Sequence, residues 1–197
     1  TAPPGSQLTG TPVKLQDVIA SGRTRHEQAH RIEAYWDLCS SVADYYLGVR
    51  EHDELRQLQQ MLPSAGAAMQ QAATEFDVRL ATSRLAAVAS QRRLASMIGV
   101  GSQSLPLPGD LPHCGSYQTR YQEIFSGRPS VEAQELAALL SSRYAELKDA
   151  AIAARRAQAW VGEVAQNDRG AGTDTLRALE LLALRRRAFI QIARDYN

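Results

Sequence analysis

The chain of 197 residues is long enough for one elongated helical bundle but short for two domains. It carries 22 Lys and Arg against 21 Asp and Glu, which leaves a formal net charge of +1. This balance excludes a bulk electrostatic attraction to nucleic acid or to an anionic membrane surface. No apolar run approaches the ~20 residues that a transmembrane helix needs. The first residue is Thr1 rather than Met, so we expect a processed or engineered fragment.

The composition predicts an all-α fold. Ala, Leu, Arg, Gln and Glu dominate, and these residues lose little on entering a helix. Aromatic residues make up 6% of the chain, and no segment alternates polar and apolar residues as a strand would. Residues 1–12 are rich in Pro, Gly, Ser and Thr, and we predict that they form a disordered leader. Residues 13–197 are predicted to form a single helical domain.

A first helical hairpin is predicted over about residues 14–99. Its first helix starts at Leu15, with a possible brief break at Ser21-Gly22, and ends at Pro63, because proline disfavours a helical conformation at the residue before it. Its second helix runs from about Ala67 to Ile98, and Gly99 provides a stop. The buried seam of this second helix alternates steps of four and three residues, a coiled-coil spacing: Met69, Ala73, Phe76, Leu80, Ser83, Ala87, Ser90, Leu94 and Met97.

The segment from 100 to 129 has a different character. Three prolines and two glycines between Ser102 and Tyr117 predict an extended, irregular connection. Four apolar or aromatic residues near its end are spaced as in one short helix that would cap the bundle: Tyr117, Tyr121, Ile124 and Phe125.

A second hairpin is predicted over about residues 130–197. Its two helices are joined by the turn Asn167 to Gly172, and Thr173 or Asp174 can cap the last helix. Both helices again show a spacing near 3.5 residues. The prediction is therefore an elongated, antiparallel four-helix coiled-coil-like bundle made of two long hairpins.

Several short segments resemble the TolC-like family of outer-membrane efflux factors. The similar segments are Ala34-Tyr35-Trp36-Asp37-Leu38, Leu94 with Gly99, Arg128-Pro129, Gly172 to Leu176, and Asp195-Tyr196-Asn197. The resemblance covers about residues 30–197 and implies two related helical hairpins lying side by side. That family also carries amphipathic membrane strands, and this sequence predicts none, so the chain resembles the helical body of such a protein.

The resemblance implies a non-catalytic domain of the bacterial cell envelope, periplasmic or associated with the outer membrane. It would act in transport or envelope assembly through helix–helix contacts, with protein partners or by self-association. It would need no nucleic acid and no cofactor, and any membrane association would come from segments outside this sequence. A true efflux channel component is a further alternative.

The sharpest local motif is His26-Glu27-Gln28-Ala29-His30, which has the HExxH form of zinc peptidases. On a helix, His26 and His30 share one face, and Glu27 would be the general base of a zinc-dependent hydrolase. The site needs a third ligand, but Glu51, Glu54 and His52 lie ~30 Å or more away along a continuous helix. Three neighbouring arginines also oppose a divalent cation: Arg23, Arg25 and Arg31. A solvated helix face is the favoured interpretation.

Two further features suggest contact surfaces. The two hairpin tips are predicted to contact partners through Pro63, Ser64, Gly170, Gly172 and Thr173. The last helix is basic, with the run 185–187 and two more arginines, Arg177 and Arg194. This basic face either binds an acidic partner or pairs with Glu132, Glu135, Glu146 and Asp149 on a neighbouring helix, and pairing is favoured.

The cysteines and the aromatic residues each allow two interpretations. Cys39 and Cys114 either form one disulfide in an oxidising compartment, or remain a buried free thiol and an unpaired loop thiol, which is favoured. The aromatic band of the first long helix favours core packing over ligand binding: Tyr35, Trp36, Tyr45 and Tyr46.

Overall fold

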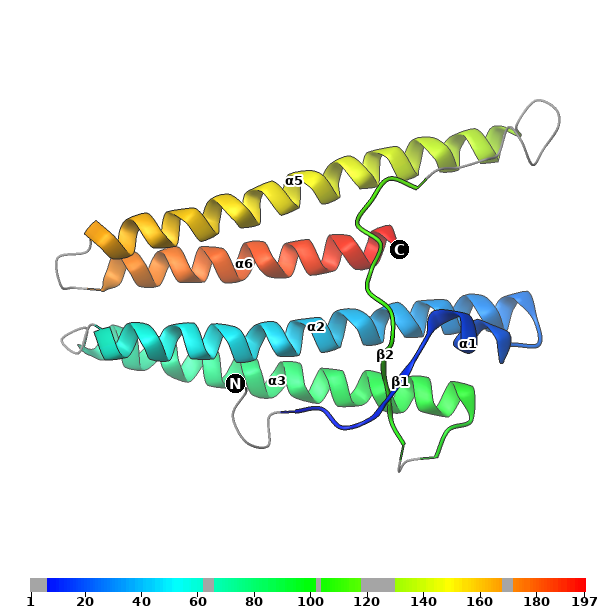
Figure 1. The fold of residues 1–197 in the computed structure, drawn as a ribbon, viewed down its shortest axis with the longest axis horizontal. Coiled ribbons are helices and arrows are strands. Elements are labelled where there is room, and N and C mark those ends of the chain that lie inside the picture. Colours follow the sequence, from blue (N-terminus) through cyan, green and yellow to red (C-terminus); the bar gives the residue numbers. More distant parts are fainter. Residues whose placement is uncertain (1–6, 62–65, 102–103, 118–129, 168–171) are drawn as a thin grey trace.

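The structure is a computed structural model that describes residues 7–61, 66–101, 104–117, 130–167 and 172–197. This part of the chain is mostly helical (Figure 1), as the composition predicts. Its helices are α1 (Leu15–Ala20), α2 (Arg25–Met61), α3 (Gly66–Ile98), α5 (Val131–Asn167) and α6 (Thr173–Tyr196), and its short strands are β1 (Thr11–Val13) and β2 (Pro106–Pro108).

Helices α2 and α3 form the first hairpin. The seam predicted for α3 is the face that α3 buries, because each of its nine residues is buried or half-buried. Gly99 follows α3 with a φ of 72°, a left-handed conformation that ends the helix and that glycine adopts without strain. In this hairpin, α2 ends at Met61 and α3 ends at Ile98, and a break between Ala20 and Arg25 separates α1 from α2.

Helices α5 and α6 form the second hairpin. Gly172 precedes α6 with a φ of 66°, and the backbone N–H of Leu176 donates to its carbonyl at 2.9 Å. At the other end, Tyr196 lies against Tyr144, with 6.0 Å between the ring centroids. Because α6 ends at Tyr196, the first turns of α5 extend past the end of its partner helix (Figure 1).

The four long helices lie in the order α3, α2, α6, α5 (Figure 1). Helix α2 is central, and it packs on α3 along one side and on α6 along the other. One core cluster joins the hairpins near the turn of the first one, and it contains Leu55, Leu58, Met69, Phe76, Leu176 and Leu179. Helix α5, in contrast, packs on α6 at the edge of this layer.

The segment before α1 is ordered against the core from residue 7 onward. Leu8 is buried in the main core cluster, and β1 pairs in parallel with β2, with Thr11 opposite Pro106. The prediction of a disordered leader is therefore wrong for residues 7–12, and residues 1–6 lie outside the described part. The prediction of no strands is also wrong, because two three-residue segments pair across more than ninety residues of sequence.

The connection between the hairpins crosses the helical layer in an extended conformation (Figure 1). Tyr35 of α2 holds it in place, because its hydroxyl donates to Asp110 Oδ2 at 2.9 Å. The same carboxylate oxygen accepts the backbone N–H of Leu15 at 2.7 Å, at the start of α1. Asp110 therefore joins the connection, α1 and α2. The predicted short helix after Tyr117 lies outside the described residues.

Candidate functional site

The two hairpins meet through a row of ion pairs between α2 and α6. Arg186 forms a bidentate pair with Glu54, at 2.7 and 3.0 Å. Arg187 donates to Asp44 Oδ1 at 3.1 Å and to Glu51 Oε2 at 2.5 Å. Bidentate and charge-assisted hydrogen bonds are geometrically specific, so this row sets how α6 lies on α2.

Glu51 is the most buried charged group of this row, with 3% of its surface exposed. Its Oε1 atom is buried and has no hydrogen-bond partner among the described residues. Burial raises the pKa of Glu51, and the guanidinium of Arg187 opposes that rise. This carboxylate depends on Arg187, because an unpaired buried charge is costly.

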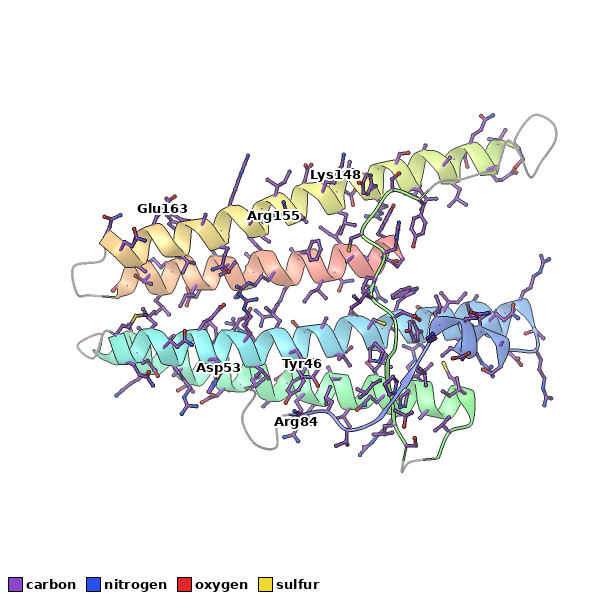
Figure 2. All side chains as sticks on the ribbon, viewed as in Figure 1. Tyr46, Asp53, Arg84, Lys148, Arg155 and Glu163 are labelled. Carbon is purple, nitrogen blue, oxygen red and sulfur yellow. The ribbon has the colours of Figure 1, made fainter. Side chains whose placement is uncertain are left out.

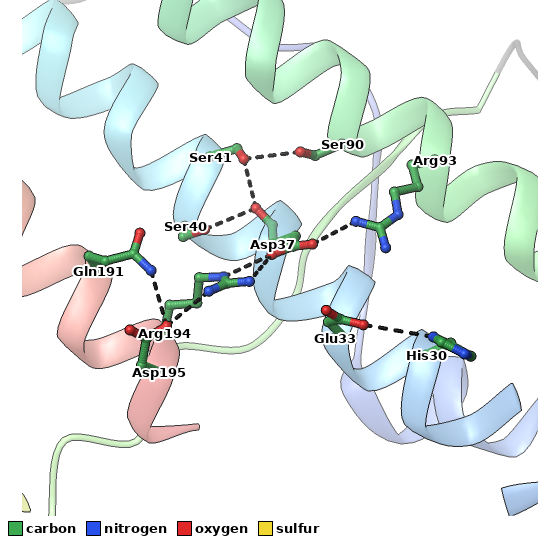
Figure 3. Close-up of polar contacts among 10 residues, drawn as sticks. All are labelled: His30, Glu33, Asp37, Ser40, Ser41, Ser90, Arg93, Gln191, Arg194 and Asp195. Atoms are coloured by element: carbon green, nitrogen blue, oxygen red, sulfur yellow. Dashed lines mark hydrogen bonds and ion pairs between the residues drawn. The ribbon is translucent and has the colours of Figure 1, made fainter. Parts of the chain in front are cut away.

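Asp37 is the centre of a second cluster, which joins three helices (Figure 3). Arg194 of α6 donates to its Oδ1 at 2.8 Å, and Arg93 of α3 donates to its Oδ2 at 2.7 Å. Ser41 donates to the Asp37 backbone carbonyl at 2.7 Å and also lies 3.0 Å from the Ser90 hydroxyl of α3. Asp37 therefore links the first hairpin to the second.

The basic face of the last helix is paired, but the predicted partners are wrong. Arg186, Arg187 and Arg194 bind acids of α2, whereas the sequence predicted pairing with Glu132, Glu135, Glu146 and Asp149. Arg177 pairs with Asp174 of its own helix at 3.6 Å. Those four residues belong to α5, where Glu146 pairs with Arg143 at 2.8 Å. The misassignment follows from the layer order, because α6 presents its arginines to α2 and an apolar seam to α5.

The acids of α2 are the contact residues that the sequence interpretation missed. Asp37, Asp44 and Glu51 are spaced by seven residues, and Arg187 and Arg194 have the same spacing. Charges that repeat every seven residues beside an apolar seam are typical of coiled-coil flanks, so this spacing could have identified the pairing.

A groove runs along the layer between α3, α2 and α6. Its first part is a hollow of about 460 Å³ lined by Ser40, Ser41, Asp44, Ala86, Leu184, Arg187, Ala188, Ile190 and Gln191. A second hollow of about 490 Å³ shares Asp44 and Ala86 with the first and continues along α3. Two exposed apolar side chains line the groove, Val78 (62% exposed) and Leu184 (61% exposed). Its other walls combine small residues with charged side chains, which are Asp44, Glu75, Arg79 and Arg187.

Helix α5 has a largely uncovered surface. Of its 37 residues, all within the described part, Leu147 and Ala157 are buried. Leu136 is 42% exposed, because it lies in the turns that extend past α6. Figure 2 shows charged side chains along the helix, among them Lys148, Arg155 and Glu163. These exposed side chains keep the outer face polar between its apolar residues.

The HEQAH segment lies in the first two turns of α2. The hydroxyl of Thr24 accepts the backbone N–H of Glu27 at 3.1 Å, and the Glu27 carboxylate accepts the backbone N–H of Arg23 at 2.8 Å. This reciprocal pattern is a capping box, and the hydrogen bond from Arg23 lowers the pKa of Glu27. Within the described residues, no group of three or more His, Cys, Asp or Glu side chains could hold a metal ion. A catalytic zinc ion needs three protein ligands, so the hydrolase interpretation gains no support.

The predicted tip contacts are described only in part. Gly172 and Thr173 lie at the start of α6, whereas Pro63, Ser64 and Gly170 lie outside the described residues. Both cysteines are free thiols, with Cys39 buried and Cys114 exposed, in agreement with the favoured interpretation. In the aromatic band, Tyr46 is 41% exposed and the other three side chains are buried in the core.

Comparisons with known proteins do not indicate what these surfaces bind. A scan of family models, a search of curated proteins and a search of solved structures each found no match. In the described part of the chain, no helix combines the length and the apolar character needed to cross a bilayer.

Proposed function

We propose that this chain is a non-catalytic helical domain of the bacterial cell envelope that acts in transport or envelope assembly through helix–helix contacts. The observation that carries the proposal is the open helical layer, which has a groove beside α3 and an edge helix, α5, that packs along one side only. The side-by-side hairpins also suit the resemblance to the helical body of TolC-like efflux factors.

The proposed occupant of the groove is α5 of a second copy of this chain. The groove follows α3 from Thr74 to Ala86, which is about 18 Å of helix. Leu136 and Leu139 of α5 are 42% and 53% exposed, and both lie in the turns beyond the end of α6. Covering these side chains and Leu184 removes apolar surface from water, which stabilises the contact by about 25 cal/mol per Å².

This contact also accounts for the predicted bundle. Within one chain, α5 and α3 are the two edges of the layer, so the four helices are not closed on one another (Figure 1). A second copy that places its α5 beside α3 would close this open layer through a face of α3 that lies mostly outside its buried seam. The two surfaces are different, so the interface is heterologous, and repeated contacts form a ring or an open filament.

Light scattering coupled to size exclusion tests the proposal. The wild-type chain should self-associate as its concentration rises. Leu184→Arg in the groove and Leu136→Arg on α5 should each give a monomer with unchanged helicity, because each places a charge in an apolar contact. A mixture of these two variants should recover dimers, because each retains the surface that the other lacks.

Leu111→Arg is the matched control, because Leu111 is 91% exposed on the connection and lies outside the groove. This variant should associate like the wild type. A wild-type chain that stays monomeric at high concentration would overturn the self-association proposal. An assembly that both arginine variants leave intact would show that another surface mediates it.

The compartment needs its own experiment. Fractionation of the source bacterium, followed by detection with an antibody against this chain, should recover it with periplasmic or outer-membrane material. Recovery in the cytosolic fraction would contradict the envelope assignment and leave the helix contacts to be explained separately.

A further inference from the structure

His26 and His30 form a close pair on the exposed face of the first turns of α2. Their Nε2 atoms lie 3.0 Å apart, and their rings meet edge to face with 4.3 Å between the centroids. Both residues are exposed, so the pair faces solvent. Glu27, between them in sequence, is engaged in the capping box and has its own role in starting the helix.

The distance between the two nitrogens suits one kind of metal geometry. Imidazole nitrogen lies about 2.0–2.1 Å from a first-row metal ion, so two nitrogens at a 90° angle are about 2.9 Å apart. A tetrahedral angle would place them about 3.4 Å apart. The observed 3.0 Å is the length of the hydrogen bond that joins the two rings, and this bond holds the nitrogens near the first value, the spacing of neighbouring positions on a square-planar or octahedral ion. A bound ion would take the place of the proton in that hydrogen bond.

Glu33 prepares one of the two ligands. Its Oε2 lies 3.7 Å from Nδ1 of His30 (Figure 3), so a proton on Nδ1 would face this carboxylate. The Nε2 atom of His30 then presents its lone pair, as in the carboxylate–histidine–metal arrangements of known metal sites. Arg31, the next residue, donates to the Ser21 hydroxyl, which engages its guanidinium elsewhere.

We propose that His26 and His30 form a two-histidine site for a divalent transition-metal ion of square-planar or octahedral preference, with water in the remaining positions. Cu²⁺ should bind more tightly than Ni²⁺ and Zn²⁺, in line with the general affinity order and the nitrogen spacing. The site differs from the HExxH interpretation, because Glu27 is not a base and no substrate is hydrolysed. It is also independent of the proposed function.

The test is a calorimetric titration of the full chain with CuCl₂, NiCl₂ or ZnCl₂ in a non-coordinating buffer. His26→Ala and His30→Ala should each weaken Cu²⁺ binding at least tenfold. The paramagnetic resonance spectrum of the wild-type Cu²⁺ complex should show splitting from two imidazole nitrogens, and each variant should lose it. Glu33→Gln should weaken binding several-fold while both nitrogens remain in the spectrum.

Two controls separate this site from other histidines and from a peptidase site. His52→Ala, which changes a histidine further along α2, should leave Cu²⁺ binding unchanged. Glu27→Gln should also leave it unchanged, with circular dichroism confirming that the helix persists. The proposal is overturned if both His26→Ala and His30→Ala bind like the wild type, if His52→Ala causes the same loss, or if Zn²⁺ binds more tightly than Cu²⁺.

Discussion

Arg194 and Asp37 face each other across the two hairpins, with 2.8 Å between Nε and Oδ1 (Figure 3). Seven residues along α2 from Asp37 lies Asp44, and seven residues back along α6 from Arg194 lies Arg187; these two also pair, at 3.1 Å. The residue numbers change in opposite directions, so the pairs fix one antiparallel register of α6 on α2. Charge pairs thus set the register of this interface, and the apolar cluster near the hairpin turns packs beside them.

Asp37→Asn should destabilise the chain by about 1–2 kcal/mol, because it weakens hydrogen bonds from two guanidinium groups. The figure is modest because Asp37 and Arg194 keep part of their surface in water. Denaturant unfolding measures the change. Glu146→Gln removes the exposed pair with Arg143 within one helix, and it should cost less than 0.5 kcal/mol. An equal loss in both variants would contradict the linking role of Asp37.

Arg187→Ala should cost about 3 kcal/mol or more at pH 7, because it leaves the buried Glu51 carboxylate without its cation. Arg185→Ala, at the exposed neighbouring position, should change the free energy of unfolding by less than 0.5 kcal/mol. Arg187→Ala should lower the free energy of unfolding less in a chain that already carries Glu51→Gln than in the wild type. Additive losses in this double-mutant cycle would show that the two side chains do not interact.

The same variant should show a distinctive pH dependence. Burial raises the pKa of Glu51 in the folded chain, so the folded state takes up this proton more readily than the unfolded state. The contribution of Glu51 to stability therefore increases as the pH falls through its folded pKa. Because Arg187 opposes this rise in pKa, its removal lets the pKa of Glu51 rise further. The free energy of unfolding that Arg187→Ala loses relative to the wild type should therefore become smaller as the pH falls from 7 to 5. A deficit independent of pH would exclude protonation of Glu51.

The contribution of Asp110 to stability should change with pH in the opposite direction to that of Glu51. Hydrogen bonds from the Leu15 backbone and from Tyr35 lower the pKa of Asp110 below its ordinary value of 3.8. Its contribution is present above that ordinary value and is lost as the pH falls through the lowered folded pKa. Acidification should therefore release the connection and α1, seen as a lower protection factor of the Leu15 amide, which is its exchange rate compared with that of an unstructured peptide at the same pH. In Asp110→Asn, the Leu15 amide should exchange faster than in the wild type already at neutral pH. A Leu15 amide that exchanges as slowly as in the wild type would contradict the linking role of Asp110.

The two thiols should react at very different rates. Cys114 is exposed, whereas burial raises the pKa of the Cys39 thiol to about 12. Because the thiolate is the reactive form, a disulfide reagent should titrate one thiol quickly and the second only on unfolding. Cys114→Ser should abolish the fast reaction and Cys39→Ser should preserve it. Two fast thiols in the folded wild type would contradict the burial of Cys39.

The Cu²⁺-binding experiment and the self-association experiment test different parts of the chain, so one proposal can fail while the other holds. Loss of Cu²⁺ binding in His30→Ala leaves the groove intact, because the pair and Leu184 lie on different helices. Loss of assembly in Leu184→Arg likewise leaves both histidines in place. Each result therefore bears on one proposal.

The sequence by itself determined the helices and the faces that they bury. The seam from Met69 to Met97 predicts the buried face of α3, and Gly99 and Gly172 mark helix ends, because these signals are local. A local signal cannot show which helix covers a seam. The sequence therefore predicted an elongated, antiparallel four-helix coiled-coil-like bundle without an order for its helices, and the tertiary structure places them in a layer with α2 at its centre and α5 at its edge.

The tertiary structure alone decided the pairings that are distant in sequence. Arg186 and Arg187 of α6 bind acids of α2 rather than those of α5, because this side of α6 lies on α2. Leu8 and β1 are ordered because a partner more than ninety residues away, around Pro106, completes their environment. Short segments of this kind have no periodicity of their own, and their order comes from the contacts that the folded chain provides.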